Sequence, residues 1–471
     1  MQKKHVLLLD VGKQSKTVGT YTKHSVLEPY GLECIGAAIQ NLGFDVKILQ
    51  KRTPSTKHIL SYEGRATLFC VGFSVRACNL QLSLKMAKEI KNLSPDTYVV
   101  FGGDYPSACP EIVKDDSVDF IVIGEGERTF GELLKFLDSG GEVTQVDGIA
   151  YWNGKLVITR PRKRIVNLDQ IPFALRNEAM LKDCRIYALM YPPPSKQRNV
   201  AQTLYSRGCP HHCSFCSSSK VWGHRVEYRS PYSVVSEIKE LQNRFATNTI
   251  FFADLTFNLD EAKVFALCDE MLKQRVKINW MAMCNLRGDG NLFKKMKQAG
   301  CTKIGFGIET LSCLARRRLN KREAIHEIKR TLDASDSVGI INRGYIMIGY
   351  PWDTREGIHK TFNILKTLPL DELKVSFFTP FPGTQAYQEF KPLLLTDDLG
   401  KYTTNKPVLK INDLSSTELI DLRKNIVRNF YLSNQYKVRM YNKIEKFPYL
   451  RDSYEELFDF LRRRNVLEGK D

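Results

Sequence analysis

The chain reads Ser206-Arg-Gly-Cys209-Pro-His-His-Cys213-Ser-Phe-Cys216 directly after a predicted strand. Its three cysteines follow the spacing Cys-x3-Cys-x2-Cys. Three thiolates on one short loop suit three corners of an iron–sulfur cube, whose usual complement is four cysteines. The closest other cysteines are Cys184 and Cys268, which do not adjoin the loop. The stretch therefore predicts a [4Fe–4S] cluster with one iron open to another ligand.

A structural zinc site is the alternative for this loop. It would combine Cys209, Cys213 and Cys216 with His211, His212 or a distant residue. Both histidines lie between the first two cysteines, which is a poor position from which to complete a tetrahedron around the same ion. Zinc ribbons also bring two separated cysteine pairs. The cluster is therefore the favoured interpretation.

Strand and helix patterns alternate around the cysteine loop, from about residue 203 to residue 382. Apolar strand-like segments are predicted at 203–206, 249–253, 279–284, 303–306, 345–348 and 374–378. Helical periodicity separates them at 230–244, 261–273, 291–299, 322–335 and 355–367. Six such units are too few to close an eight-fold barrel, so we expect a partial (β/α)6 barrel whose site lies at the C-terminal ends of its strands.

The N-terminal region alternates in the same way. Short apolar runs occur at 6–9, 46–49, 68–73, 98–101 and 120–123, with helical patterns at 32–42 and 80–93. This order predicts an α/β domain with a doubly wound, Rossmann-like parallel sheet. Ligands of such sheets bind beyond the carboxyl ends of the strands.

These strand ends carry glycines. The turns are Asp10-Val-Gly12, Gly72-Phe-Ser-Val75, Gly102-Gly-Asp-Tyr-Pro106 and Gly124-Glu-Gly-Glu-Arg128. Glycine lets a backbone approach a ligand closely, so the set indicates a large flat ligand or a nucleotide tail. Ordinary strand-to-helix turns explain any single member equally well. Gly124-Glu-Gly126 begins like a dinucleotide fingerprint, but Thr129 occupies the position of the third glycine, so NAD is weakly supported.

Four segments are predicted: a first domain at 1–145, a connector at 146–199, the partial barrel at 200–388 and a helical C-terminal region at 389–471. Within the connector, a hairpin is expected around Asn153-Gly154. Tyr191-Pro-Pro-Pro-Ser195 indicates extended backbone. The C-terminal region is polar and basic and carries no recognisable chemistry.

The composition is that of an ordinary globular protein. Of 471 residues, 43% are hydrophobic and 26% are charged, which excludes disordered and collagen-like chains. No apolar run approaches the roughly 18 residues of a membrane span, and Asp10 ends the first apolar run too early for a secretory signal. We therefore expect a soluble, cytoplasmic protein.

Charge and cysteine usage add two expectations. Lys and Arg outnumber Asp and Glu by 70 to 52, a net charge of +18. The charge is spread and is not interleaved with aromatic residues, so nucleic acid is not an expected partner. The chain has twelve cysteines, and those outside the loop are scattered. This favours a reducing compartment over a disulfide framework.

The cysteine spacing, preceded by Ser206-Arg-Gly208 and with Phe215 before the last cysteine, resembles the radical S-adenosylmethionine (SAM) signature. The resemblance implies that Cys209, Cys213 and Cys216 hold the cluster. It also implies that the open iron takes the amino and carboxylate groups of SAM, and that Phe215 lies beside the adenine. The partial barrel expected above matches the fold of that superfamily.

Other predicted strand ends are similar to further parts of that SAM site. Phe251-Phe-Ala-Asp254-Leu-Thr-Phe-Asn258 resembles the segment near the SAM amino group, although Ala253 occupies a position where relatives often have a second acid. Asn285-Leu-Arg287 resembles the arginine site near the SAM carboxylate, and Gly305-Phe-Gly-Ile-Glu309-Thr310 resembles the segment whose acid approaches the ribose. Two further stretches resemble rim loops: Gly349-Tyr-Pro-Trp-Asp353-Thr354 and Phe378-Thr-Pro-Phe-Pro-Gly383-Thr384. The SAM contacts implied are Phe215, Asp254, Arg287, Glu309 and Gly349.

The N-terminal region resembles the cobalamin-binding domain that precedes the barrel in one large radical SAM branch. The resemblance rests on Glu28-Pro-Tyr-Gly31-Leu-Glu, Gly102-Gly103 and Gly124-Glu-Gly-Glu-Arg128-Thr-Phe. The Asp-x-His-x-x-Gly motif that supplies a histidine to cobalt elsewhere is absent, as in many relatives, and His24 is expected to be a solvated loop residue. The cobalamin contacts implied are Ser74, Gly102, Gly103, Gly124, Glu125 and Gly126.

The resemblance covers about residues 5–140 and 200–385 and implies a cobalamin-dependent radical SAM enzyme. The first expectation is a methyltransferase that acts on an unactivated carbon of a small molecule, such as an anionic compound or a natural product. A 5′-deoxyadenosyl radical would remove a hydrogen atom, and the carbon radical would take the methyl group of methylcobalamin. A flavodoxin or ferredoxin is the implied electron donor. No catalytic side chain is assigned.

Two alternatives stay open at this point. One keeps both cofactors but performs ring contraction, oxidation or cyclisation without methyl transfer. The other is an RNA-modifying methylthiotransferase, which the basic charge favours slightly. Relatives of that kind usually have additional cluster cysteines near the N-terminus, whereas Cys34, Cys70 and Cys78 lack cluster spacing here.

Overall fold

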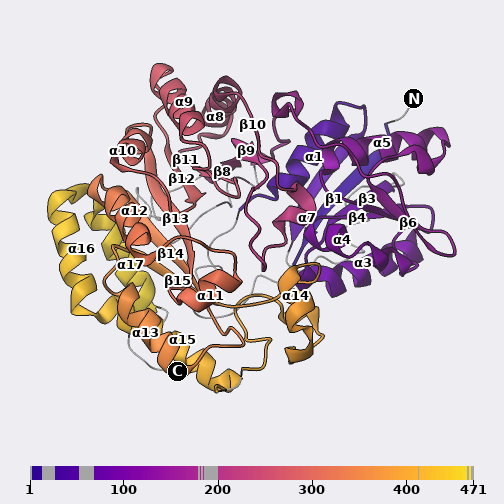
Figure 1. Ribbon diagram of the computed structural model, residues 1–471. Coiled ribbons are helices and arrows are strands. Elements are labelled where there is room, and N and C mark those ends of the chain that lie inside the picture. The colour runs from indigo at the N-terminus through magenta and orange to yellow at the C-terminus, as the bar shows by residue number, and fades with distance from the viewer. Residues whose placement is uncertain are drawn as a thin grey trace.

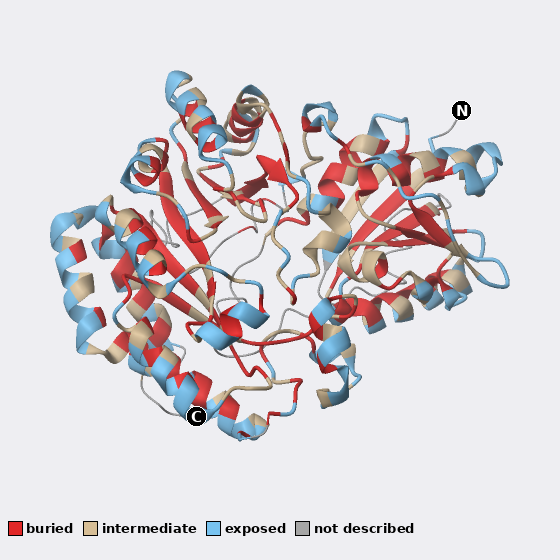
Figure 2. Cartoon of the chain, in the orientation of Figure 1, coloured by how far each residue is buried: buried red, intermediate tan, exposed pale blue. Residues whose placement is uncertain are grey.

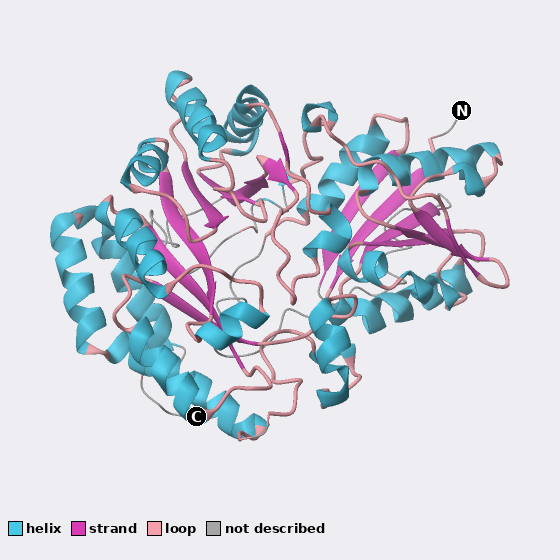
Figure 3. Cartoon of the chain, viewed as in Figure 1, coloured by secondary structure: helices cyan, strands magenta, loops and turns pink. Residues whose placement is uncertain are grey.

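The computed structural model describes residues 3–12, 27–51, 68–178, 181, 184, 200–411, 413–463 and 466–467. Within these ranges the chain forms two large sheets that lie side by side and are covered by helices (Figures 1 and 3). The expected α/β class and two-part architecture are confirmed. In the described ranges, no helix combines the length and apolar character that crossing a bilayer requires.

The first sheet has the order β2-β1-β3-β4-β5-β6-β7 over the described N-terminal residues. Strands β1 to β5 are parallel, and their order is doubly wound, with the topological switch point between β1 and β3. The strands are β1 (His5–Val11), β2 (Asp45–Lys51), β3 (Leu68–Ser74), β4 (Tyr98–Gly102), β5 (Phe120–Val122), β6 (Ile149–Trp152) and β7 (Leu156–Ile158).

Alternation along β1 explains the two helical layers on this sheet. Leu7 and Leu9 pack in a core shared with one helix layer, whereas Val6 and Leu8 pack in a second core on the opposite face. A strand buried on both faces is what a continuous apolar run predicts. The helices are α1 (Tyr30–Gln40), α3 (Leu80–Leu93), α4 (Asp104–Ala108) and α5 (Gly126–Ser139).

The second sheet lies within residues 200–411, which are described without a gap. Its six strands are all parallel, in the order β15-β14-β13-β12-β11-β8. The sheet is open between β8 and β15, so the expected partial barrel is confirmed. The strands are β8 (Val200–Thr203), β11 (Thr249–Phe252), β12 (Asn279–Cys284), β13 (Cys301–Glu309), β14 (Ile341–Ile348) and β15 (Glu372–Phe377).

The outer face of this sheet is covered by helices that are buried on one side only (Figure 2). Polar side chains begin several of these helices. Ser230, Asp260, Asp289 and Thr354 each accept a hydrogen bond from a first-turn N–H, which satisfies one of the donors left over at a helix start. The helices are α8 (Pro231–Phe245), α9 (Glu261–Lys273), α10 (Gly290–Gln298), α12 (Ile325–Ser337) and α13 (Arg355–Leu365).

Short elements line the carboxyl ends of these strands. They are β9 (Ser206–Arg207), β10 (Glu227–Tyr228), α7 (Ser218–Trp222), α11 (Cys313–Arg318) and α14 (Gln385–Phe390). Strands β9 and β10 pair antiparallel and hold the base of the cysteine loop.

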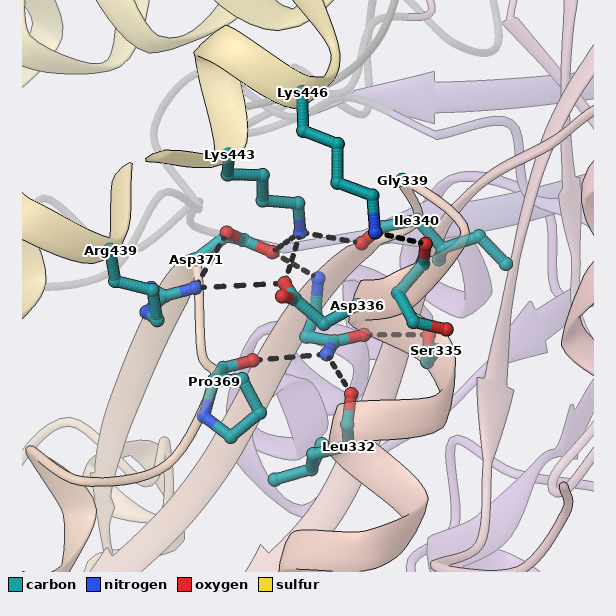
Figure 4. A network of polar contacts seen from close by, with 12 residues as sticks. Leu332, Ser335, Asp336, Gly339, Ile340, Pro369, Asp371, Arg439, Lys443 and Lys446 are labelled. Atoms are coloured by element: carbon teal, nitrogen blue, oxygen red, sulfur yellow. Dashed lines mark hydrogen bonds and ion pairs between the residues drawn. The ribbon is translucent and has the colours of Figure 1, made fainter. Parts of the chain in front are cut away.

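The C-terminal region is helical, as expected, and packs on the barrel. Its helices are α15 (Ser416–Leu432), α16 (Asn434–Lys446) and α17 (Arg451–Arg463). A buried carboxylate, Asp371, ties α16 and α17 to the start of β15 (Figure 4). It accepts hydrogen bonds from Lys443 at 2.7 Å and Arg439 at 3.0 Å, and from the Tyr454 hydroxyl. Burial opposes the charge of Asp371, but Lys443 and Arg439 hold its pKa below the ordinary value.

A second charged cluster joins the first domain to the barrel. Arg176 of the connector donates to Glu237 of α8 at 2.8 Å and to Glu28, just before α1, at 3.4 Å. The Glu28 carbonyl accepts from the Gln202 side chain on β8 at 2.7 Å. Burial opposes the charge of Glu237, yet Arg176 and Arg229 hold its pKa below the ordinary value. The described part of the connector is thus fixed to both domains.

Two expectations need correction. The hairpin around Asn153-Gly154 forms, but β6 pairs with β5 and so extends the first sheet instead of lying in a connector. The first barrel strand ends at Thr203, where the sequence predicted it to begin. Tyr191-Pro-Pro-Pro-Ser195 and His24 lie outside the described residues, and the boundaries at 145, 199 and 388 stay predictions.

Candidate active site

The cysteine loop runs from β9 to α7, at the carboxyl end of β8. Cys209 and Cys213 are half-buried, Cys216 is exposed, and all three are free thiols. The backbone folds on itself here, because the Cys216 N–H donates to the Cys213 carbonyl at 3.1 Å. Within the described residues, no three histidine, cysteine or acidic side chains converge on one point as a metal site. The loop therefore brings the thiols together without closing them into a ligand set.

The thiols share one electrostatic environment. Burial raises the pKa of Cys213 to about 11, Lys321 opposes the rise, and Cys216 and Cys209 add to it. Sulfur ligands bind iron as thiolates, so a bound iron–sulfur cluster would hold them deprotonated. Soft sulfur donors at this spacing fit an iron–sulfur cluster.

Asp254, at the end of β11, fixes the backbone that leads into the cysteine loop. Its carboxylate is 3% exposed and accepts from the Tyr205 N–H at 2.9 Å and from the Ser206 N–H and hydroxyl at 2.6 Å. Burial raises the pKa of Asp254 to about 6, against the lowering effect of these hydrogen bonds. The hydrogen bonds from Tyr205 and Ser206 direct this carboxylate toward the loop's base, and a SAM contact from Asp254 stays a prediction.

Arg207, two residues before Cys209, is held by the first domain. Its buried guanidinium pairs with Glu125 at 3.3 Å and with Glu127, both from the start of α5. It also lies over the Trp222 ring at 5.0 Å. Burial opposes the charge of Arg207, and Glu127 and Glu125 raise its pKa above the ordinary value. The structure thus gives Glu125, an expected cobalamin contact, a partner next to the cysteines. We call Arg207, Glu125 and Glu127 the interdomain clamp.

The far side of the cysteine loop is anchored by segments that follow β13 and β15. The Ser214 carbonyl accepts from the Ala386 N–H at 2.9 Å, and the His212 carbonyl accepts from the Asn320 side chain at 2.8 Å. Phe215 is half-buried and packs on an apolar cluster that includes Tyr350 and Phe378. The loop is therefore fixed at both sides by segments distant in sequence.

The other expected SAM contacts lie at the same rim but differ in their surroundings. Glu309 ends β13 with a φ of 65°, a left-handed conformation that is costly for a residue with a Cβ and is typical of functional sites. Burial raises the pKa of Glu309, and Lys321 and Arg316 counteract the rise. Arg287 is exposed, and its carbonyl accepts from the Asn258 side chain at 2.7 Å. Gly349 has a φ of 88°, and its N–H donates to Asp353 at 2.8 Å.

Buried polar atoms at this rim lack protein partners. Among the described residues, they include Asn285 Oδ1, Tyr350 OH, Trp352 Nε1 and His211 Nε2. A buried polar atom without a hydrogen bond costs free energy, so such a group calls for an explanation. A polar ligand bound between the cysteine loop and the ends of β12 and β14 would supply the missing partners, which fits SAM. The sequence did not single out these atoms.

The expected cobalamin contacts gather at the carboxyl ends of β3, β4 and β5. Ser74 lies beside the switch point at which doubly wound sheets bind ligands, and Gly102 and Gly124 lie at the ends of the next two strands of the sheet. Their small side chains leave the backbone accessible, which fits a large ligand. At Gly103 and Gly126, packing within the first domain requires glycine whether or not a ligand binds. A Cβ on Gly103 would lie 2.8 Å from the Val75 carbonyl oxygen, and one on Gly126 would lie 2.7 Å from Ile35.

The rim of the first sheet faces the rim of the barrel. A Cβ on Gly124 would lie 3.5 Å from the carbonyl oxygen of Val221 in α7. A Cβ on Gly383, in the loop after β15, would lie 2.5 Å from the Cβ of Ala108 in α4. Figure 1 shows α4, α7 and α14 together where the two halves meet. The cysteine loop and the ligand end of the first sheet are therefore adjacent.

Comparison with family models agrees with this division. The model described as the radical SAM superfamily matches residues 203–365. The model described as the B12 binding domain matches residues 17–134. The first covers the cysteine loop and the strands up to β14, and the second covers β2 to β5 and part of α5.

Curated relatives and solved structures resemble the chain over most of its length. An uncharacterized methyltransferase of Pyrococcus horikoshii is 29% identical over 90% of this chain and 89% of its own. An anaerobic magnesium-protoporphyrin IX monomethyl ester cyclase of Rubrivivax gelatinosus is 27% identical over 78% of this chain and 66% of its own. The structure of OxsB, a cobalamin-dependent S-adenosylmethionine radical enzyme, superposes with a TM-score of 0.71 at 16% identity, over 100% of this chain and 76% of that one. This last likeness concerns the fold.

Proposed function

The chain is a member of the cobalamin-binding radical SAM enzymes, and we propose that it transfers a methyl group to an unactivated carbon of a small-molecule substrate. The curated relative that aligns with 90% of the chain carries the name of a methyltransferase. The observation that carries the proposal is the contact between the two rims, because it brings the cysteine loop next to the ligand end of the first sheet.

Three groups of residues are proposed to hold the cofactors. Cys209, Cys213 and Cys216 would hold the [4Fe–4S] cluster. The rim atoms without partners, together with Phe215 and Glu309, would hold SAM. The ends of β3, β4 and β5, with Ser74, Gly102, Gly103, Gly124 and Gly126, would hold cobalamin. When bound, these groups supply the radical and methyl-transfer chemistry.

The side chains of this protein contribute position. Asp254 fixes the start of the cysteine loop through three hydrogen bonds. Arg207 fixes the same segment to the first domain through Glu125 and Glu127. Reacting groups must be held within fractions of an ångström, and such supporting contacts provide that precision.

The proposal is tested anaerobically with the full chain. The protein is reconstituted with iron, sulfide and cobalamin, and SAM and a chemical reductant are then added. 5′-Deoxyadenosine and S-adenosylhomocysteine are quantified by mass spectrometry. Both products, with S-adenosylhomocysteine dependent on cobalamin, are expected. Absence of both from a protein with a full cluster would refute the proposal. Replacing the chemical reductant by flavodoxin or ferredoxin tests the further proposal that a small electron-transfer protein is the natural donor.

The first variant to examine is Cys213→Ala. Removing one of three thiolate ligands should abolish cluster assembly and SAM cleavage, because no other described cysteine adjoins the loop. Iron content and 5′-deoxyadenosine formation measure the two effects. Cys313→Ala, which removes an exposed cysteine on α11, is the matched control and should change neither. Normal cluster formation in Cys213→Ala would contradict the ligand assignment.

Radical cyclisation is the second candidate, favoured by the cyclase relative that is 27% identical over 78% of the chain. It would use the same thiols and the same rim. The assay separates the two functions. Cyclisation converts SAM to 5′-deoxyadenosine but transfers no methyl group from SAM to cobalamin, so it forms no S-adenosylhomocysteine. Deoxyadenosine alone, in the presence of cobalamin, would favour cyclisation over methyl transfer.

A further inference from the structure

The inner face of β14 and β15 differs from their outer face. On β15, Leu373, Val375 and Phe377 belong to the apolar core beneath the outer helices. Side chains alternate along a strand, so Glu372, Lys374 and Ser376 point to the concave side of the sheet. The cross-strand register pairs them with Arg343, Tyr345 and Met347 of β14. The concave side of these two strands is therefore lined by charged and hydroxyl-bearing residues.

The acid on this face already has partners. Both oxygens of Glu372 accept from the Lys303 ammonium of β13, at 2.6 and 2.7 Å. The Arg343 guanidinium lies 3.5 Å from the same carboxylate and 5.0 Å from the Tyr345 ring. Glu372, the acid on this face, is thus already paired, and it lies at the amino end of β15.

Lys374 has no such acid. No described carboxylate forms an ion pair with its ammonium, and the charged groups that act on it are Arg343 and Arg423 of α15. Burial, together with these two guanidinium groups, lowers the pKa of Lys374 to about 7. Burying a cation beside other cations is unfavourable without an opposing charge.

Lys374 is also reachable. Tyr345, Met347, Lys374 and Ser376 are all half-buried, although they lie within central and edge strands of a covered sheet. They follow one another toward the carboxyl end of the strands, where the cysteine loop lies. A ligand at the rim could therefore extend one end along this face.

We propose that this face binds an anionic group of the substrate, a carboxylate or a phosphate, with Lys374 and Arg343 as its cationic contacts. The assignment of the anion to a substrate rests on the proposed function. A primary ammonium and a guanidinium are the two side chains that pair with carboxylate and phosphate oxygens. The hydroxyls of Tyr345 and Ser376 lie on the same face and are suitable additional donors.

The test labels lysines in the reconstituted holoenzyme without reductant. Acetic anhydride is added with and without inorganic phosphate or acetate as probes, and acetylation is read lysine by lysine by peptide mass spectrometry. Phosphate and acetate are expected to lower acetylation of Lys374 severalfold, because a bound anion raises its pKa and covers it. Exposed Lys437 on α16 is the internal control and should be unaffected.

Variants sharpen the result. Arg343→Gln should weaken phosphate protection of Lys374 by about tenfold in concentration, the loss expected for one charged hydrogen bond. Lys374→Met should weaken phosphate binding measured by calorimetry to the same degree, whereas Lys374→Arg retains the charge and should restore it. Lys437→Met is the matched control and should bind phosphate as the parent does.

Three outcomes would overturn the inference. If neither probe protects Lys374, the face binds no anion; if protection is the same in Arg343→Gln, Arg343 is not a contact of the anion. Alternatively SAM alone protects Lys374 and displaces phosphate, and then the anion is the SAM carboxylate and not the substrate. The labelling involves no turnover, so a protein that protects Lys374 but cleaves no SAM would refute the proposed function and leave the anion site standing.

Discussion

Two buried charge clusters at opposite ends of the barrel strands have different architectures. The interdomain clamp, Arg207 with Glu125 and Glu127, precedes the cysteine loop at the carboxyl end of β8 and draws its acids from another domain. The Asp371 cluster lies at the amino end of β15 and draws its cations from α16. One cluster fixes the start of the cysteine loop, and the other fixes helices to a sheet.

The two clusters also differ in what surrounds them. Around Asp371, the carboxylate accepts from the Asn342 N–H at 2.6 Å as well as from Lys443 and Arg439, so its oxygens are well satisfied. Only one nitrogen of Arg439 there lacks a partner among the described residues. Near the clamp, Arg207 Nε and the rim atoms named above lack partners. Satisfied polar groups are typical of structural clusters, and unsatisfied ones are typical of ligand sites.

The largest expected effect follows from removing the clamp. Arg207→Met leaves Glu127 buried without its cation and leaves Glu125 with Arg164 at 3.8 Å, and a loss of this kind typically costs about 3–5 kcal/mol of unfolding free energy. Because Arg207 is two residues from Cys209, iron content after reconstitution should fall as well. Denaturation and iron analysis measure the two effects. A variant with normal iron and parental stability would remove the distinction between the two clusters.

The next effect concerns the other cluster. Asp371→Asn leaves Lys443 and Arg439 with Asp336 as their remaining acid, at 2.6 and 3.8 Å, and should lower the free energy of unfolding by about 3 kcal/mol. The cysteine loop lies at the opposite end of the strands, so iron bound per folded molecule should equal that of the parent. Loss of iron from folded Asp371→Asn would show that the two ends are coupled.

Asp254 gives a smaller effect with a defined pH dependence. Its pKa rises from 3.8 in the unfolded chain to about 6 in the folded one, so its stabilising contribution is full at low pH and is lost as the pH rises through about 6. Asp254→Asn replaces one acceptor by a donor and should cost about 1–3 kcal/mol. The difference in unfolding free energy between parent and variant should shrink from pH 4 to pH 6.5. A difference independent of pH would contradict the buried state of this carboxylate.

The smallest effect is expected for an exposed pair. Arg355 of α13 donates to Glu418 of α15 at 2.7 Å, and both side chains are about half exposed. Exposed ion pairs contribute about 0–1 kcal/mol because solvent screens them. Arg355→Met should therefore leave the midpoint of thermal or urea unfolding within experimental error of the parent. A larger loss would mean that burial is not what separates the strong clusters from this pair.

Local periodicity predicted most helices and strands. The predicted helix 261–273 coincides with α9, and the predicted strand 279–284 coincides with β12. The first barrel strand was placed too late because Leu204 and Tyr205 continue the apolar run. In the structure the N–H groups of Tyr205 and Ser206 donate to Asp254 instead of to a neighbouring strand, so the ladder ends earlier. That competition depends on a residue about fifty positions away.

The site was predicted unevenly for the same reason. The three thiols share one loop, and their spacing was sufficient to group them. Arg207 and Glu127 were quoted within motifs but received no role, because each is explained only by the other, across the domain boundary. Gly103 and Gly126 were assigned to a ligand, whereas close backbone and side-chain approaches already require them. Arg207 and Glu127 are charged residues beside glycines at strand ends, and this shared feature was the signal that could have predicted their ion pair.

The anchoring of the cysteine loop has a consequence for biosynthesis. Ser214 receives its backbone hydrogen bond from Ala386, and His212 receives one from Asn320. Both donors leave the ribosome long after the cysteines. A nascent chain that ends before residue 320 therefore carries the three thiols on a loop without either distal anchor. The order of synthesis thus sets the earliest point at which the loop reaches its final shape, and metal delivery to this protein belongs after that point.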